Sequence, residues 1–494
     1  MTSIPRFGCS RLVLGALLAA LMFGTPAVAH AHGRLKSSAP GSGAHLSLIP
    51  RELRLEFSEV PDLTFSTIAL LDDTGKPVAL GTLQYSVSSH RVVVASISST
   101  LRPGTYVVQW QLAGDDGHPV RGRFDFVIAP GAMLGVADSA MGGVVMDHDT
   151  VVRGMVMHHD VASMPDGEGF GVASPAFVVI RWLQFIAMLL TIGAVVFRQL
   201  VLRVLRREQT PDSPMLDGAE ARAARIGHIA VGILALTLLL RLLAQSYAMH
   251  GAAGAWNVRL SAQMIAHTMW GKGWLLQLVG LAVAGVGFQV ADRARRAHAV
   301  FGHSAMHRRT GWLIAAIGVV ILAFSPAVAG HAASVPGFRA LGVLADALHI
   351  LAASGWLGSL TLVLTAGLPA AMALADGERG PMVAALINAF SPVALASAAV
   401  VTITGVFAAW LHVGHVPNLW GTRYGITLLV KLGILGVVAL TGFYNWRFVQ
   451  PTLGTDAATV HLRRSARVEV AVAILVLLVT AVLVATPTSM DMVM

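Results

Sequence analysis

The chain has 494 residues, of which 55% are hydrophobic and 12% are charged. An ordinary soluble domain carries about 25% charged residues, so the composition excludes soluble domains for most of the chain. The formal net charge of +9 comes from short clusters of Lys and Arg between apolar runs, which is typical of membrane topology and not of a nucleic-acid-binding surface. The single cysteine, Cys9, lies in a segment that we expect to be removed, which excludes disulfides and iron–sulfur clusters. A site for a soft metal ion would therefore use Met and His, and the chain has 19 of each.

The first 31 residues have the pattern of a secretory signal peptide. Two arginines precede the apolar run 12–23, and small residues of the A-x-A type follow it. Cleavage after Ala29 or after Ala31 fits this pattern, and the new N-terminus is then His30 or His32. An uncleaved anchor helix is the alternative, but the apolar run is short for a membrane span.

Residues 32–130 are expected to form an exported β domain. Short runs of β-forming residues are separated by turn signals such as Asp73-Thr74-Gly75 and Arg102-Pro103-Gly104. The expected strands are 53–57, 64–71, 92–97, 106–110 and 124–128. Strands of this length and spacing predict an all-β Greek-key sandwich or barrel of the immunoglobulin-like type.

A linker rich in Gly, Met and His occupies residues 131–175, and residues 176–494 are expected to form an all-α membrane domain. Eight apolar runs are long enough to cross a hydrocarbon core of about 30 Å. They lie at about 177–202, 226–249, 274–291, 312–330, 340–366, 383–411, 425–446 and 468–486.

The distribution of arginine predicts the orientation of these spans. If the β domain lies outside, the first, third and last connections face the cytoplasm, and these are the arginine-rich segments 203–225, 293–309 and 447–467. The opposite connections hold few positive residues. The positive-inside rule therefore agrees with the signal peptide and predicts a multi-pass protein of the bacterial inner membrane, with the β domain and the C-terminus on the periplasmic side.

The exposed N-terminal histidine suggests a metal site. An N-terminal His offers its α-amine and its imidazole to one ion, and the amine must lose its proton to bind. Asp116 and His118 are two residues apart at a turn and would supply a carboxylate and a second imidazole. A planar set of nitrogen and oxygen donors suits Cu(II). Taken alone, Asp116 and His118 are also compatible with an ordinary turn that carries an exposed histidine.

Three motifs in this region resemble the periplasmic copper-binding family CopC. They are residues 32–40 (HGRLKSSAP), 55–59 (LEFSE) and 115–122 (DDGHPVRG), and the resemblance covers nearly the whole β domain. The spacing of the first motif is more similar to the family if cleavage follows Ala31, so that His32 is the first residue.

The resemblance implies a Cu(II) site made of His32, Asp116 and His118, with Glu59 close by. The methionine-rich loop that some members use for Cu(I) is absent, because residues 70–80 contain no Met. A Cu(I) site within the β domain is therefore not expected.

The linker is a second candidate for copper binding. Thioether and imidazole groups suit Cu(I) and Cu(II) respectively, and methionine in a solvated linker has no packing role. The candidate relay residues are Met146, His148, Met155, Met157, His158 and His159. A flexible spacer with incidental Met and His remains the alternative.

The membrane part resembles the CopD family of copper-resistance membrane proteins. The residues that carry the resemblance are 346–349 (DALH), 355–358 (GWLG) and 419–425 (LWGTRYG), followed by Lys431 and Asn445. The similarity is spread over about 300 residues. The fusion of the two families implies delivery of copper from the outer domain into or through the bilayer.

Asp346 and His349 are expected to share one face of the fifth span, because they are three residues apart. Ionisable groups in a span usually face an interior path or a partner, and the expected counter-charges are Lys431 and Arg241. A purely structural bridge remains the alternative.

Further histidines lie at the predicted outer ends of the spans. They are His250, His267, His331, His412 and His415. The spacing of His412 and His415 predicts that both lie on one helical turn. Each of these residues is either a copper ligand or a polar anchor at the membrane surface.

The sequence as a whole predicts a copper transport, homeostasis or resistance protein that is not an enzyme and that imports copper. No G-x-x-x-x-G-K-[ST] motif is present, so nucleotide-driven pumping is not expected. Its partners would be the copper ion, the lipid bilayer and a periplasmic copper carrier or a copper-requiring membrane protein, without nucleic acid. One alternative is a copper-loading, assembly or sensing protein without net transport. Another is a membrane haem or redox protein, which would need paired histidines on facing helices.

Overall fold

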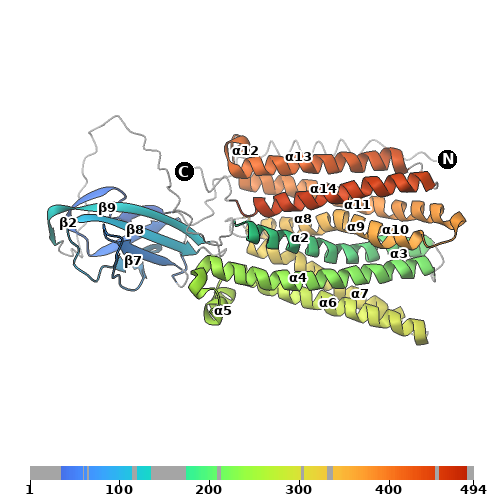
Figure 1. The fold of residues 1–494 in the computed structure, drawn as a ribbon, viewed down its shortest axis with the longest axis horizontal. Coiled ribbons are helices and arrows are strands. Elements are labelled where there is room, and N and C mark those ends of the chain that lie inside the picture. The colour runs from blue at the N-terminus through green and yellow to red at the C-terminus, as the bar shows by residue number, and fades with distance from the viewer. Residues whose placement is uncertain are drawn as a thin grey trace. The chain divides into compact units, whose positions relative to one another are not determined.

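A computed structural model describes residues 35–134, 174–208, 213–301, 305–330, 338–450 and 456–486, apart from 59, 64–65 and 114–118 (Figure 1). The described residues belong to two compact units, one within His32–Gly169 and the other from Phe170 onward. The first unit is a β sandwich and the second is a helical domain with eight helices long and apolar enough to span a membrane. This confirms the predicted fold class.

Two sheets form the sandwich. One has the strand order β1-β3-β7-β6 and the other the order β2-β9-β8-β4-β5. The strands are β1 (Leu35–Ala39), β2 (Ala44–Ile49), β3 (Glu52–Phe57), β4 (Thr67–Leu71), β5 (Pro77–Val78), β6 (Gln84–Ser86), β7 (Ser89–Ser96), β8 (Gly104–Ala113) and β9 (Pro119–Leu134).

The alternation of apolar and polar residues accounts for the core of the sandwich. In β3, Leu53, Leu55 and Phe57 are fully buried while the residues between them are not, as expected for a strand with one face toward a core. Phe57 of the first sheet meets Trp110 of the second, with ring centroids 5.4 Å apart. Opposite Trp110 in the β8–β9 ladder is Gly122, where a Cβ would lie 2.3 Å from the indole ring. Glycine is therefore required at this position.

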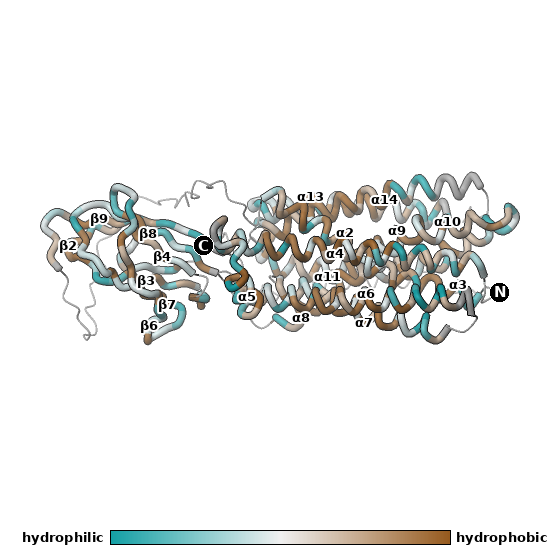
Figure 2. Tube along the Cα trace, turned by 60° about the horizontal axis from the view of Figure 1, so that its bottom comes forward, coloured by the Kyte–Doolittle hydropathy of each residue, from teal (hydrophilic) through white to brown (hydrophobic). Residues whose placement is uncertain are grey.

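The helical domain follows the predicted spans. Figure 2 shows that the middle parts of its helices are mainly hydrophobic. The α-helices are α2 (Pro175–Val196), α3 (Leu202–Glu208), α4 (Pro214–Gly254), α5 (Val258–His267), α6 (Met269–Phe301), α7 (Ala305–Ala329), α8 (Arg339–Ala353), α9 (Ser359–Leu362), α10 (Leu368–Ala371), α11 (Asp376–Val413), α12 (Asn418–Gly421), α13 (Arg423–Tyr444) and α14 (Asp456–Leu483).

Among the described residues, four short π-helical segments interrupt the spans: η1 (Phe197–Val201), η3 (Ser354–Gly358), η4 (Val363–Gly367) and η5 (Asn445–Val449). π-Helical turns are rare and often lie at functional sites. Segment η3 approaches α2 very closely, because a Cβ on Gly193 would lie 2.6 Å from the backbone of Gly358. Small residues of this kind allow close packing of helices in membranes, and here they join the first span to the fifth.

Candidate functional site

Successive spanning helices alternate in direction along the chain (Figure 1). We call the end of the bundle where α2 begins the Pro175 end, and the opposite end, where α3 finishes, the Glu208 end.

A polar cluster formed by three helices lies inside the bundle. Asp346 and His349 come from α8, Thr404 from α11 and Lys431 from α13. Asp346 is about 10 Å from the start of its span at the Pro175 end, given the rise of 1.5 Å per residue. Asp346, His349 and Lys431 are half-buried, which is unusual for charged groups so far along a membrane span. The predicted pair of Asp346 and His349 therefore lies in a larger group of side chains.

His349 is held by α11. Its Nδ1 lies 2.8 Å from Thr404 Oγ1, and the same hydroxyl donates its proton to the carbonyl of Val400 at 2.7 Å. Because a hydroxyl has only one proton to donate, Thr404 must accept from His349 Nδ1–H. This tautomer leaves the lone pair on Nε2, which is the atom that a metal ion would bind. Gly405 lies beside the ring, and a Cβ there would be in ordinary van der Waals contact with His349 Cε1 at 3.5 Å.

The counter-charge of Asp346 is Lys431. The charge of Lys431 acts on both Asp346 and His349, yet within the described chain no ion pair closer than 4 Å joins Lys431 to Asp346. The second expected counter-charge, Arg241, is elsewhere. Arg241 donates to Gln184 Oε1 at 3.3 Å and stacks over the Trp270 ring at 5.7 Å. The prediction that Arg241 pairs with Asp346 is therefore wrong.

The remaining described histidines do not form a metal cluster. His250 Nδ1 lies 3.1 Å from the carbonyl of Ser246, and His267 is the exposed last residue of α5. The ring of His412 lies 6.4 Å from that of Tyr424. No group of three or more His, Cys, Asp or Glu side chains that could hold a metal occurs in the described part of the chain.

His412 and His415 do not share a helical turn, contrary to the prediction. Helix α11 ends at Val413, and Gly414 has a φ of 68°. A glycine in this conformation commonly ends a helix, so His415 lies beyond it.

Most other candidate ligands lie outside the described residues and stay predictions. These are His32, Glu59, Asp116 and His118 of the β domain, Met146, His148, Met155, Met157, His158 and His159 of the linker, and His331.

The strand ends that adjoin the β-domain candidates in sequence are described, and their pairing shows where these ends lie in the sandwich. Leu35, the first residue of β1, pairs with Phe57, the last residue of β3. Ala113 pairs with Pro119 at the ends of β8 and β9. Because Phe57 also contacts Trp110 near the end of β8, these four strand ends lie on the same side of the sandwich.

Two buried carboxylates were missed by the sequence analysis. Glu220 of α4, 2% exposed, pairs with Arg198, Arg206 and Arg308 and accepts a hydrogen bond from Trp312 Nε1 at 2.8 Å. This network joins η1, α3, α4 and α7 near the Glu208 end. Glu220 lies within an arginine-rich segment, and an acidic residue among several arginines is the signal that would have indicated an ion network.

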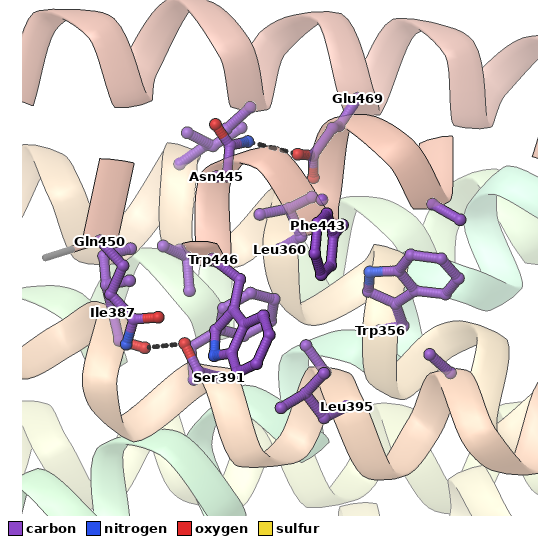
Figure 3. Close-up of a pocket in the computed structure, with 18 of the residues that line it drawn as sticks. Trp356, Leu360, Ile387, Ser391, Leu395, Phe443, Asn445, Trp446, Gln450 and Glu469 are labelled. Carbon is purple, nitrogen blue, oxygen red and sulfur yellow. Dashed lines mark hydrogen bonds between the residues drawn. The ribbon is translucent and has the colours of Figure 1, made fainter. Parts of the chain in front are cut away.

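The second missed carboxylate is Glu469 of α14, 4% exposed, which accepts a hydrogen bond from Asn445. Its signal is a single acidic residue in an apolar run. Glu469 lines an open cavity of about 330 Å³ to which the fifth to eighth spans contribute (Figure 3).

Comparison with known protein families agrees with this architecture. The family described as "CopC domain" matches residues 35–129, "Copper resistance protein D-like, N-terminal domain" matches 172–343, and "Copper resistance protein D" matches 384–483. The chain is a fusion of a CopC domain with a CopD membrane protein. This confirms the resemblance to both families.

Individual relatives cover either the whole fusion or its CopC part. "Copper transport protein CutJ" of Bacillus subtilis is 25% identical over 482 residues, which are 95% of this chain and 77% of the relative. "Copper resistance protein C" of Pseudomonas syringae pv. tomato is 30% identical over 107 residues, 21% of this chain and 84% of the relative. The crystal structure of CopC from Methylosinus trichosporium OB3b is 29% identical and covers 20% of this chain and 95% of that chain, with a TM-score of 0.19. This CopC–CopD fusion thus belongs to a copper resistance and transport family and is a multi-pass membrane protein.

Proposed function

We propose that this CopC–CopD fusion captures Cu(II) in its β domain and passes copper through its helical domain toward the cytoplasm. The observation that carries the proposal is the presence, on one chain, of a copper-family capture domain and of a half-buried Asp346–His349–Lys431 cluster within a spanning bundle. A capture domain alone needs no such cluster, and ionisable groups within a span commonly mark an ion path.

The proposed capture site consists of His32, Asp116 and His118, with Glu59 beside it. Support comes from the strand ends. His32 precedes the start of β1 and Glu59 follows the end of β3, and these two strand ends are paired. Asp116 and His118 connect the paired ends of β8 and β9 on the same side of the sandwich. The pairing of these strand ends supports a single site to which three separate segments of the chain contribute ligands.

Within the bundle, we expect His349 Nε2 to be the atom that binds copper. Its ring is oriented by Thr404, in the way that an outer hydrogen bond fixes the tautomer of a metal-binding histidine. The carboxylate of Asp346 offsets part of the charge of the passing cation, and Lys431 balances Asp346 when the site is empty. The Met and His residues of the linker, together with His250, His267, His331, His412 and His415, are proposed as a relay at the Pro175 end.

The proposed orientation places the Pro175 end outside. It is supported by the signal peptide and by the arginine-rich connections, which fall at the Glu208 end.

The test is uptake of radioactive copper by proteoliposomes that contain the full chain. We expect accumulation above protein-free vesicles. A copper-loading or sensing protein would give none, and that result would contradict the proposal. An optical spectrum of the purified chain tests the haem alternative. A Soret band would show bound haem and would favour a redox protein over a copper transporter. The direction of transport is tested by the copper content of cells grown at limiting copper. An importer should raise this content relative to cells that lack the protein.

A further inference from the structure

The cavity beside Glu469 is a separate feature from the copper path. It is lined by the fifth to eighth spans and includes residues of three π-helical segments, among them Trp356 of η3 and Trp446 of η5. Along α13, Asn445 lies about 21 Å from Lys431, given the helical rise per residue. None of its lining residues is His, Met or Cys, so it has no donors for a soft metal ion.

The polar end of the cavity presents one hydrogen-bond acceptor. Asn445 donates to Glu469 Oε1 and accepts from Ser465 Oγ at 2.7 Å, so it is engaged on both sides and fixes the carboxylate. Among the described residues, none donates to Glu469 Oε2, and none forms an ion pair with the carboxylate. The arginines nearest to it in sequence, Arg464 and Arg467, are exposed and screened by solvent ions.

A buried carboxylate without a cation is costly in a region of low dielectric constant. A positively charged group that enters the cavity would remove this cost. The remaining walls are mainly aliphatic and include four aromatic side chains, and Figure 3 shows Trp446 and Trp356 flanking Phe443 below the Asn445–Glu469 pair. Aromatic rings attract ammonium groups through their faces and pack against flat apolar bodies. The volume of about 330 Å³ is within the range of small-molecule sites.

We propose that this cavity binds a lipophilic organic ammonium ion, with the ammonium group on Glu469 Oε2 and the apolar body among Trp356, Phe443 and Trp446. A neutral lipid tail would fill the same walls but leave the carboxylate unpaired. An organic anion would meet Glu469 with like charge. This binding function does not depend on copper transport.

The experiment compares three probes that share one ring system: 1-naphthylmethylammonium, 1-naphthylmethanol and 1-naphthylacetate. Equilibrium dialysis measures their binding to the full chain in nanodiscs, after subtraction of partition into empty nanodiscs. We expect the ammonium probe to bind at least about tenfold more tightly than the alcohol, as for a hydrogen bond to a charged group, and the acetate to bind most weakly. Equal binding of the ammonium and the alcohol would overturn the proposal, as would binding no better than in empty nanodiscs.

Variants assign the binding to the cavity. Glu469→Gln should weaken binding of the ammonium probe by about tenfold or more and leave binding of the alcohol nearly unchanged. Glu378→Gln, at an exposed position outside the cavity, is the matched control and should change neither. Ala394→Phe fills the cavity from α11 without touching the carboxylate and should reduce binding of all three probes, which keeps the test open if Glu469→Gln does not fold. Unchanged ammonium binding in folded Glu469→Gln or Ala394→Phe protein would overturn the assignment.

Discussion

The β domain and the membrane domain bury different kinds of side chain. Within the described part of the β domain, Ser66 is the only polar residue that is fully buried, and the rest of its core is apolar. The helical domain buries charged residues, including Arg181, Arg198, Glu220 and Glu469. Apolar burial from water is enough to stabilise a sandwich. Helices in lipid gain little from contact between apolar faces and rely on close packing and polar contacts instead.

The buried charges of the helical domain are of two types. Glu220 is saturated, because three arginines and an indole surround it. The Asp346 cluster is sparse, because Lys431 acts on it without a close ion pair. In a saturated network every carboxylate oxygen already has partners, so the network holds helices together and cannot bind a passing ion. A sparse cluster still has groups that can bind one. We therefore expect the Glu220 network to stabilise the bundle and the Asp346 cluster to act in the proposed copper path.

The largest expected effect is on stability. Glu220→Gln leaves three arginines without their common anion, and removing one partner of a buried ion network costs about 3–5 kcal/mol. We expect the free energy of unfolding in detergent to fall by this amount, while copper uptake per folded molecule is retained. Asp292→Asn is the control, since Asp292 pairs only within its own half-buried helical turn with Arg295 and Arg296 and should lose less than about 1 kcal/mol. Equal losses in the two variants would contradict the division into saturated and sparse sites.

The next effect concerns the proposed Cu(II) site of the β domain. His118→Ala should weaken Cu(II) binding to the full chain by at least about a hundredfold, because it removes a proposed direct ligand. Loss of a residue that only hydrogen-bonds to a metal ligand already lowers metal affinity by about 10- to 100-fold. Isothermal titration calorimetry measures the loss. His45→Ala is the control, because His45 is exposed on β2 and pairs with Val127, away from the four strand ends. An additional residue before His32 displaces the α-amine and should also weaken binding, and unchanged affinity in either variant would refute the site.

The fold was largely predictable because its signals are local. Alternation in Leu53, Leu55 and Phe57 is readable in the sequence, and so is an apolar run of span length. Strands β1, β2, β5 and β6 were not predicted. β5 and β6 have only two and three residues, which is too few to show a periodicity. Helix α5 was missed, since ten residues between two spans resemble a loop. The π-helical segments have no sequence pattern of their own.

The site was predictable only where its members are neighbours in sequence. The pair of Asp346 and His349 follows from helical spacing, whereas Thr404 is brought to His349 by the packing of α8 on α11. The pairing of Asn445 with Glu469 depends on the contact of α13 with α14 in the same way. Arg241 was assigned to the wrong partner because the sequence gives its charge but not the face of α4 on which it lies.

Asp346→Asn tests the sparse cluster directly. Without the carboxylate, the cation of Lys431 is no longer balanced, and we expect copper uptake by proteoliposomes to fall by more than about tenfold. Folded protein should be recovered in near-normal amount, as judged by gel filtration. The double variant Asp346→Asn/Lys431→Gln restores neutrality and should restore any lost folded protein but not uptake. Recovery of uptake in the double variant would show that the pair is structural.

Thr404→Val tests how His349 is oriented, and its effect should be smaller. Loss of one hydrogen bond to the imidazole costs about 1 kcal/mol, so we expect the KM for copper uptake to rise about fivefold. Thr402→Val is the matched control, because its hydroxyl is exposed on the same helix and bonds only to the carbonyl of Ala398. An equal change of the KM in both variants would contradict a specific role of the Thr404 hydroxyl.

The smallest effect is expected at an exposed carboxylate of the β domain. In the turn between β4 and β5, Asp72 accepts hydrogen bonds from the Thr74 hydroxyl at 2.6 Å and from the Lys76 backbone N–H at 2.9 Å. These bonds favour the ionised form and lower the pKa of Asp72 below its usual value. A lowered pKa in the folded state means that this stabilisation is present above the unfolded pKa, about 3.9, and is lost as the pH falls through the folded value.

Asp72→Asn should therefore lower the unfolding temperature of the β domain slightly at pH 7 and leave it unchanged at acid pH, where Asp72 is protonated in both states. Circular dichroism of the β signal against temperature at the two pH values measures the difference. Asp73→Asn is the control at the neighbouring exposed position. A large loss at pH 7 would mean that an exposed turn stabilises the sandwich as strongly as the buried network stabilises the bundle, and the contrast between the two domains would no longer hold.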